Sequence, residues 1–168
     1  VAFVAQALAG KTILAGEANK PGAYSKRTLN LMASLDKRDA TAFKTLCNFA
    51  LGMGESRPLI FDSSADIYTK NGIDFQTLKH LDSAGLISFE SISGYRLQNL
   101  PKTVRISYEK TLISVTFAND QNNDLQIGHV LLTTSGEELS RMCTPTPVEG
   151  FIDYLIQEWG KHGATASI

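Results

Sequence analysis

The first third of the chain carries apolar residues at helical spacing. Residues 26–35 follow Ser25, a typical N-cap residue, and place their apolar side chains on one face. A second helix is predicted to begin after Asp36 and to end at Gly52 and Gly54. The apolar stripe of this second helix comprises Ala40, Phe43, Leu46, Cys47, Ala50 and Leu51.

The middle of the chain predicts a helix, a turn and paired strands in close succession. Asp74 is placed to cap a helix over residues 75–84, and Gly85 stands where a left-handed C′ residue would end it. A strand is predicted to start directly after Gly85, and residues 89–97 read as a hairpin with Gly94 near its turn. The residues of the helix that we expect to face inward are Phe75, Leu78 and Leu81.

Strict alternation of apolar and polar residues marks the later segments as half-buried antiparallel strands. A helix is then predicted with Thr134 or Ser135 as its N-cap, and residues 146–149 have the capping-box arrangement that would open a final helix ended by Gly163. The alternating apolar positions are Val104, Ile106, Tyr108, Ile113, Val115, Phe117, Leu125, Ile127 and Leu131, with His129 in the same phase.

These elements predict an α+β fold with a winged-helix-like core. Residues 78–87 (LKHLDSAGLI) and 131–139 (LLTTSGEEL) are typical of such a core, and the stretch between them holds extra strands. We expect an extended antiparallel sheet, preceded by two or three helices and closed by a C-terminal helix. Residues 1–54 form the helical part of this prediction and residues 55–168 the winged-helix-like part, in one compact unit.

Composition limits the classes of function. The 168 residues are 43% apolar, and the net charge of −1 gives no global argument for nucleic acid or an anionic membrane. Residues 11–38 are locally basic, with six lysines and arginines against two acidic residues. Cys47 and Cys143 are far apart in sequence, which is typical of reduced, buried thiols in a cytoplasmic protein. No apolar run approaches the roughly 20 residues of a membrane span, and the apolar start without Met leads us to expect part of a longer protein.

No catalytic motif is apparent in the sequence. Gly10-Lys11-Thr12 resembles the end of a phosphate-binding loop, but Ala5 stands where its first glycine belongs. His80, His129 and His162 are too widely spaced for a local metal motif, no G-x-S-x-G surrounds a serine, and a metal nuclease would need an acidic partner upstream of Glu109-Lys110. We therefore predict a protein that is not an enzyme and that binds no metal or cofactor.

A family resemblance adds to this interpretation. Residues 13–29 read I-L-A-G-E-x-x-x-P-G-x-x-S-x-R-T-L, and residues 36–47 read D-K-R-D-A-x-x-F-x-x-L-C. These segments resemble an uncharacterised bacterial family catalogued as domain of unknown function 2806, although Lys11-Thr12 stand where that family usually has a nearby tryptophan. A weaker likeness links the chain to the abortive-infection alpha proteins, which implies a role in phage defence by analogy.

Two groups of residues are candidates for binding. The first is a predicted interaction patch that would contact a protein partner or a second copy; its alternative is a local role, with Glu17 paired to Arg27 and Ser25 capping a helix. The second would contact nucleic acid if the winged-helix-like part reads DNA, but its charges are mixed rather than basic, so we favour a regulatory or protein-interaction domain. The first group comprises Glu17, Lys20, Ser25, Lys26, Arg27 and Thr28, and the second Gln76, Thr77, Lys79, His80 and Arg96.

Overall fold

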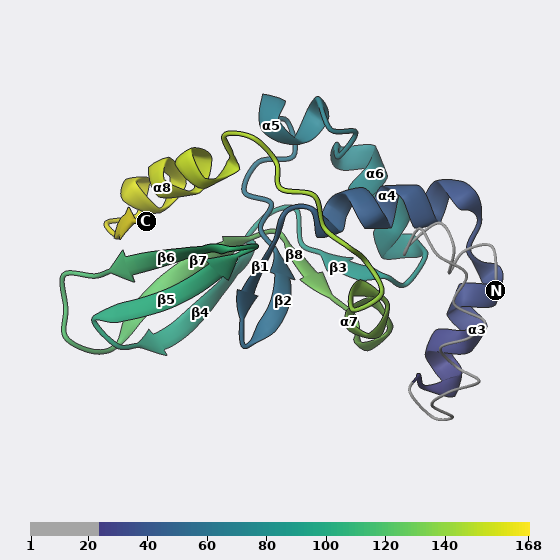
Figure 1. The fold of residues 1–168 in the computed structure, drawn as a ribbon, viewed down its shortest axis with the longest axis horizontal. Helices are drawn as coiled ribbons and strands as arrows, with labels where there is room; N and C mark the ends of the chain where they lie inside the picture. The colour runs from purple at the N-terminus through teal and green to yellow at the C-terminus, as the bar shows by residue number, and fades with distance from the viewer. Residues whose placement is uncertain (1–23) are drawn as a thin grey trace.

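The computed structural model describes residues 24–168, which form an α+β fold of helices and antiparallel strands (Figure 1). The helices are α3 (Lys26–Ser34), α4 (Lys37–Cys47), α5 (Asp66–Thr69), α6 (Phe75–Ser83), α7 (Thr134–Ser140) and α8 (Phe151–Lys161). The strands are β1 (Ala50–Met53), β2 (Glu55–Pro58), β3 (Ile87–Phe89), β4 (Tyr95–Leu100), β5 (Thr103–Tyr108), β6 (Thr111–Thr116), β7 (Asn123–Gly128), β8 (Val130–Leu132) and β9 (Thr165–Ser167).

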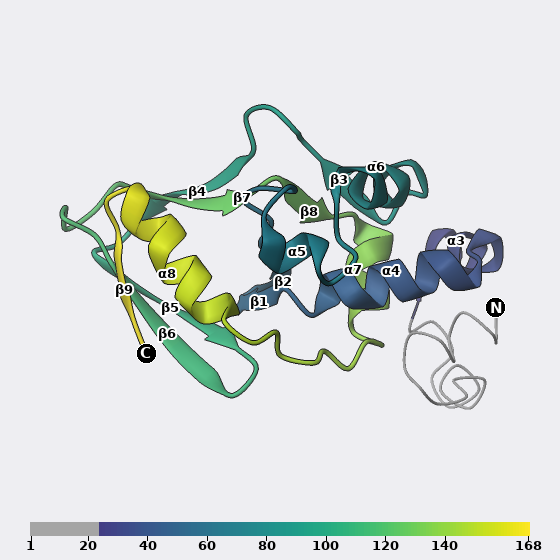
Figure 2. The same ribbon diagram turned by 90° about the horizontal axis from the view of Figure 1, so that it is seen from above.

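The strands form one larger sheet and two pairs. The larger sheet has the order β2-β1-β5-β6-β9, and the pairs are β3-β8 and β4-β7. Every strand pairing is antiparallel. Figures 1 and 2 show α8 lying against the strands at one end of the molecule, while α3, α4, α6 and α7 gather at the other end.

An aromatic cluster joins the sheet to the helices. The Phe49 ring lies 5.1 Å from both Tyr68 of α5 and Phe151 of α8, measured between ring centroids. Tyr108 at the end of β5 lies 5.3 Å from Phe151, and Trp159 is fully buried where its Nε1 donates to the Gln126 carbonyl of β7. Burial of these large rings contributes to the packing of α5 and α8 against the strands.

Local signals for helix ends are confirmed. The Ser25, Asp36 and Asp74 side chains each accept a hydrogen bond from a backbone N–H in the first turn of α3, α4 and α6, and Asp36 does so within a capping box closed by Asp39. Gly85 ends α6 with φ of +80°, the left-handed conformation that favours glycine.

Three predicted helix limits are wrong. Residues 50–53 form β1 rather than the end of a helix, because Gly54, with φ of +85°, turns the chain into a hairpin with β2. The predicted boundary between residues 54 and 55 therefore falls within a paired hairpin. Helix α7 is capped by Thr133 instead of a residue further on, and α8 begins after Gly150 with no capping box. The backbone before α8 is held out of the helix, since the N–H groups of Thr146 and Val148 donate to Asn48 Oδ1 and the Tyr108 hydroxyl.

The predicted hairpin over residues 89–97 is also wrong. Strands β3 and β4 do not pair with each other; β3 pairs with β8 and β4 with β7, so a loop over 90–94 separates them. Gly128, with φ of +85°, shifts the phase between β7 and β8, so Val130 is buried and Leu131 only half-buried. Phe75 does not face the core as expected, since 44% of it is exposed.

Candidate functional site

The structure separates the described residues of the predicted interaction patch into two groups. Glu17 and Lys20 lie outside the described residues. Ser25 and Thr28 connect α3 to α7: the Ser25 N–H donates to Glu138 Oε2 at 2.9 Å, and the buried Thr28 hydroxyl donates to Ser135 Oγ at 3.0 Å. These contacts give both residues a structural task at the helix junction.

The exposed part of the patch consists of Lys26 and Arg27, in the first turn of α3. Neither forms an ion pair within residues 24–168. A binding role for this patch therefore stays a prediction that concerns these two side chains in particular.

The lysine and the arginine of the predicted nucleic-acid face are each paired with a carboxylate. Lys79 Nζ lies 3.8 Å from Asp82 Oδ2, and Arg96 Nη1 lies 3.7 Å from Asp124 Oδ2. Gln76 and His80 are exposed on α6, and Thr77 is half-buried. The positive groups that would contact phosphates thus already face carboxylates.

A hydrogen bond between helices engages His80. Its Nε2 lies 2.5 Å from Asp39 Oδ1 of α4. Burial opposes ionisation of Asp39, but the Asp36 N–H and His80 outweigh it and hold the pKa of this carboxyl below its ordinary value. This pair fixes the spacing of α4 and α6 and leaves the other ring nitrogen of His80 facing away from Asp39.

A groove of about 570 Å³ runs between α4 and α6. The Thr41 and Thr45 hydroxyls donate to carbonyls of their own helix, so they offer only acceptors to a ligand. Lys37 and Arg38 form no ion pair within residues 24–168. The residues that line the groove are Lys37, Arg38, Thr41, Ala42, Thr45, Asn71, Gly72, Thr77 and His80.

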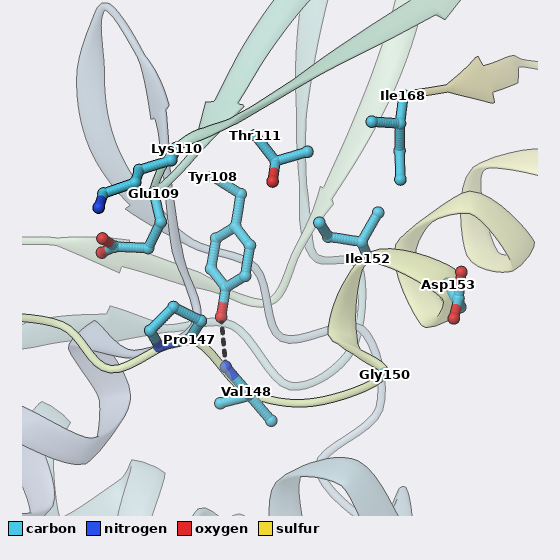
Figure 3. A pocket seen from close by; sticks show the side chains of 10 residues that line it. All are labelled: Tyr108, Glu109, Lys110, Thr111, Pro147, Val148, Gly150, Ile152, Asp153 and Ile168. Atoms are coloured by element: carbon cyan, nitrogen blue, oxygen red, sulfur yellow. Dashed lines mark hydrogen bonds between the residues drawn. The ribbon is translucent and has the colours of Figure 1, made fainter.

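A hollow of about 600 Å³ lies between the β5–β6 turn and the start of α8 (Figure 3). The Tyr108 hydroxyl donates to the Asn48 carbonyl at 2.7 Å and accepts from the Val148 N–H at 2.8 Å, and burial raises the pKa of this phenol. Figure 3 shows Asp153 on the opposite side from Glu109 and Lys110. The hollow offers space and apolar surface, but its ionisable groups do not converge as general acid–base catalysis requires.

The third cavity, of about 120 Å³, is small and aromatic. Phe75 at the start of α6 meets Phe89 of β3 edge to face, with ring centroids 5.5 Å apart. Asp62 Oδ1 accepts from both the N–H and the hydroxyl of Ser64, and these bonds hold the pKa of Asp62 below its ordinary value. The cavity, which we call the aromatic cavity, is lined by Phe61, Asp62, Ser63, Phe75, Phe89, Ser91 and His129.

An exposed apolar side chain lies in the loop that follows this cavity wall in the chain. Ile92, in the loop between β3 and β4, is 90% exposed and follows Ser91 of the cavity wall. Figure 2 shows this loop standing out from the molecule between β4 and the end that carries α6. We call the surface formed by Phe75, Lys79, Phe89 and Ile92 the α6–loop surface.

Comparison with known protein families places the chain. It matches the family described as "Protein of unknown function (DUF2806)" over residues 5–156. The chain belongs to the DUF2806 family. No curated protein and no solved structure matched this DUF2806 chain significantly.

The DUF2806 match spans most of the described fold, from α3 into α8, and includes the aromatic cavity, the groove between α4 and α6, and every lining residue of the larger hollow except Ile168. Within residues 24–168 no three His, Cys, Asp or Glu side chains lie close enough together to hold a metal ion. None of the helices in that same range has the length and apolarity that a membrane span requires.

Sequence reasoning on this DUF2806 chain did not find the aromatic cavity. Its walls come from residues 61–63, from the start of α6, from β3 with the loop that follows, and from His129 between β7 and β8. The one local signal is an aromatic residue at the first helical position after the Asp74 N-cap, where a side chain points away from the core.

Proposed function

We propose that this DUF2806 chain is a non-catalytic, regulatory interaction domain that binds another protein through the α6–loop surface. The observation that carries the proposal is the exposure of two apolar side chains: Phe75 (44%), in the wall of the aromatic cavity, and Ile92 (90%), which follows the cavity residue Ser91 in the chain. Exposed large apolar side chains are often found where one protein contacts another.

Charge supports a protein partner over nucleic acid. Lys79 of this surface and Arg96 of β4 are both paired with carboxylates, while Asp62 and Asp74 have no ion pair among the described residues. Duplex DNA carries about one negative charge per 1.7 Å of its axis, so carboxylates here would repel it. A partner segment with apolar and cationic side chains fits this surface better.

Nucleic acid binding is the second candidate, and one observation favours it. Lys37 and Arg38 line the groove between α4 and α6, next to Thr77 and His80 of the predicted winged-helix face. Phosphate oxygens are natural partners for such cations. In this alternative the DNA backbone would lie along α4 rather than on the exposed face of α6.

The cellular role we propose is regulation or assembly of a longer bacterial protein used against phage. The likeness of the sequence to abortive-infection alpha proteins supports this role by analogy alone. The interaction itself is the part that the geometry supports.

Site-specific photo-crosslinking tests the interaction. p-Benzoylphenylalanine would replace Phe75, Ile92 or Leu112 in the full-length protein, expressed in its own bacterium. Leu112 is the matched control, because it is 51% exposed but belongs to β6, outside the helix, strand and loop that carry the α6–loop surface. We expect one discrete protein adduct from positions 75 and 92 and none from position 112.

Three outcomes would overturn the proposal. Adducts of the same kind from position 112, or none from positions 75 and 92, would show that the surface is not an interface. Adducts that disappear after nuclease digestion would identify nucleic acid as the partner. An adduct with twice the chain's mass would identify the partner as a second copy, which keeps the surface and names its occupant.

A further inference from the structure

We infer that the aromatic cavity binds the ammonium group of a lysine side chain that the protein partner presents. The inference rests on the proposed function, because it names the side chain with which that partner would be anchored. It is carried by the chemistry of the cavity walls, in which three phenylalanines stand beside Asp62 and His129.

Asp62 and His129 supply acceptors to the wall, and the hydroxyls of Ser63 and Ser91 can accept as well as donate. Asp62 Oδ1 is occupied by Ser64, but Asp62 Oδ2 has no hydrogen-bond partner within residues 24–168. His129 Nδ1 lies 2.6 Å from the Glu90 carbonyl oxygen. A carbonyl can only accept, so Nδ1 carries the proton, and in the neutral ring Nε2 is then an acceptor as well. A ligand group that donates hydrogen bonds and carries a positive charge would therefore complement the carboxylate and the imidazole lone pair.

The aromatic walls favour the same guest. Phe61, Phe75 and Phe89 border the cavity, and the faces of such rings attract cations. The structure already shows one example, since Lys79 Nζ lies 5.9 Å from the centre of the Phe89 ring while it pairs with Asp82. An anion would be repelled by the Asp62 carboxylate, and a purely apolar guest would leave Asp62 and His129 without new partners.

Size selects one side chain. The cavity offers about 120 Å³. A single water needs roughly 10–15 Å³ of such volume, so the cavity has room for the end of one side chain but not for a larger ligand. A lysine fits because its methylene stem can lie along the exposed edge of Phe75 while its ammonium reaches inward.

Binding of a small probe tests this assignment. Nα-acetyl-lysine N-methylamide would be titrated into the isotope-labelled chain while the aromatic and His129 resonances are followed by NMR. Nα-acetyl-norleucine N-methylamide, which lacks only the ammonium group, is the matched neutral control. We expect saturable shifts for the lysine probe, with a dissociation constant on the order of millimolar, and none for the norleucine probe.

Two variants measure how much Asp62 and Phe89 each contribute to binding of the lysine probe. Asp62→Asn should weaken the lysine probe roughly two- to fivefold, the range for one exposed charge pair. Phe89→Leu should weaken it roughly two- to tenfold, because it replaces the ring but keeps an apolar side chain. Asp66→Asn is the control, since Asp66 is exposed and paired with Lys70 outside the cavity.

The inference is wrong if the norleucine probe binds equally well, if no shift occurs at millimolar concentrations, or if Asp62→Asn has no effect. Spermidine serves as a further arm; binding of spermidine more than tenfold tighter than the lysine probe would make a free polyamine the ligand. Failure of the probe with intact crosslinks at positions 75 and 92 would remove the lysine assignment alone. Binding of the probe without crosslinks would remove the proposed function instead.

Discussion

Removing the Thr28 hydroxyl should destabilise the fold without touching its surface. Thr28 is fully buried, and its hydroxyl accepts from Ser25 Oγ and donates to Ser135 Oγ, both at 3.0 Å. Thr28→Val keeps the shape of the side chain but leaves the buried Ser135 hydroxyl without its donor. The Ser25 hydroxyl is only partly buried and can turn to water.

The magnitude follows from which groups lose a partner. One buried polar group left unsatisfied costs about 1–3 kcal/mol, and the partly exposed Ser25 adds little, so we expect a loss of about 1–2 kcal/mol. For a chain of this size that corresponds to a fall in Tm of roughly 2–8 °C. Urea unfolding followed by circular dichroism would measure the free energy, and calorimetry would measure the Tm.

Exposed neighbours provide the control for this measurement. Lys26→Ala and Arg27→Ala remove side chains that project into solvent from the same turn, and such changes usually stay within about 0.5 kcal/mol. If Thr28→Val proves as stable as these two variants, the hydroxyl does not connect α3 to α7. The residue would then have to be considered again as part of the predicted interaction patch.

Two further predictions concern α6 and the start of α4. Gly85→Val places a β-branched residue at φ of +80° and should lower the free energy of unfolding, measured with urea, by about 1–3 kcal/mol. The nearest atom to an added Cβ is 3.9 Å away, so the loss would come from backbone strain and not from a clash. An unchanged stability would mean that this strain is absent. The pKa of Asp39 is lowered on folding, so its ionised form adds stability that is present above about pH 4 and is lost as the pH falls through the lower, folded value. Asp39→Asn should flatten this part of the stability curve against pH, and an unaltered curve would contradict the contact of Asp39 with the Asp36 N–H and His80.

Short-range signals predicted much of this fold. The caps at Ser25, Asp36 and Asp74 and the left-handed Gly85 depend only on residues within a turn of each other, and the structure confirms them. The antiparallel alternation around Ile106 is confirmed for the same reason, because one buried face imposes its own period.

Long-range pairing could not be predicted in this way. Residues 50–53 keep a helical spacing of apolar side chains, yet pairing with β2 and β5 makes them a strand. The hairpin expected over 89–97 fails because the partners of β3 and β4 lie far along the chain. The aromatic cavity depends on those same pairings, which bring His129 beside Phe89, so no local pattern could have located it.

The strand pairings also have a consequence for how the chain reaches this fold. The β5–β6 hairpin turns over the two residues Glu109 and Lys110, with Glu109 at φ of +51°. In sequence, this hairpin lies between the paired strands β4 and β7, and these in turn lie between the paired strands β3 and β8. If the inner hairpin forms first, it shortens the effective loop that each outer pair must close. The folding order with the lowest loop-closure entropy cost therefore starts at this turn and adds the outer pairs one after another. In that order Phe89 and His129 meet last, and assembly of the aromatic cavity depends on a turn in the five-stranded sheet, to which neither residue belongs.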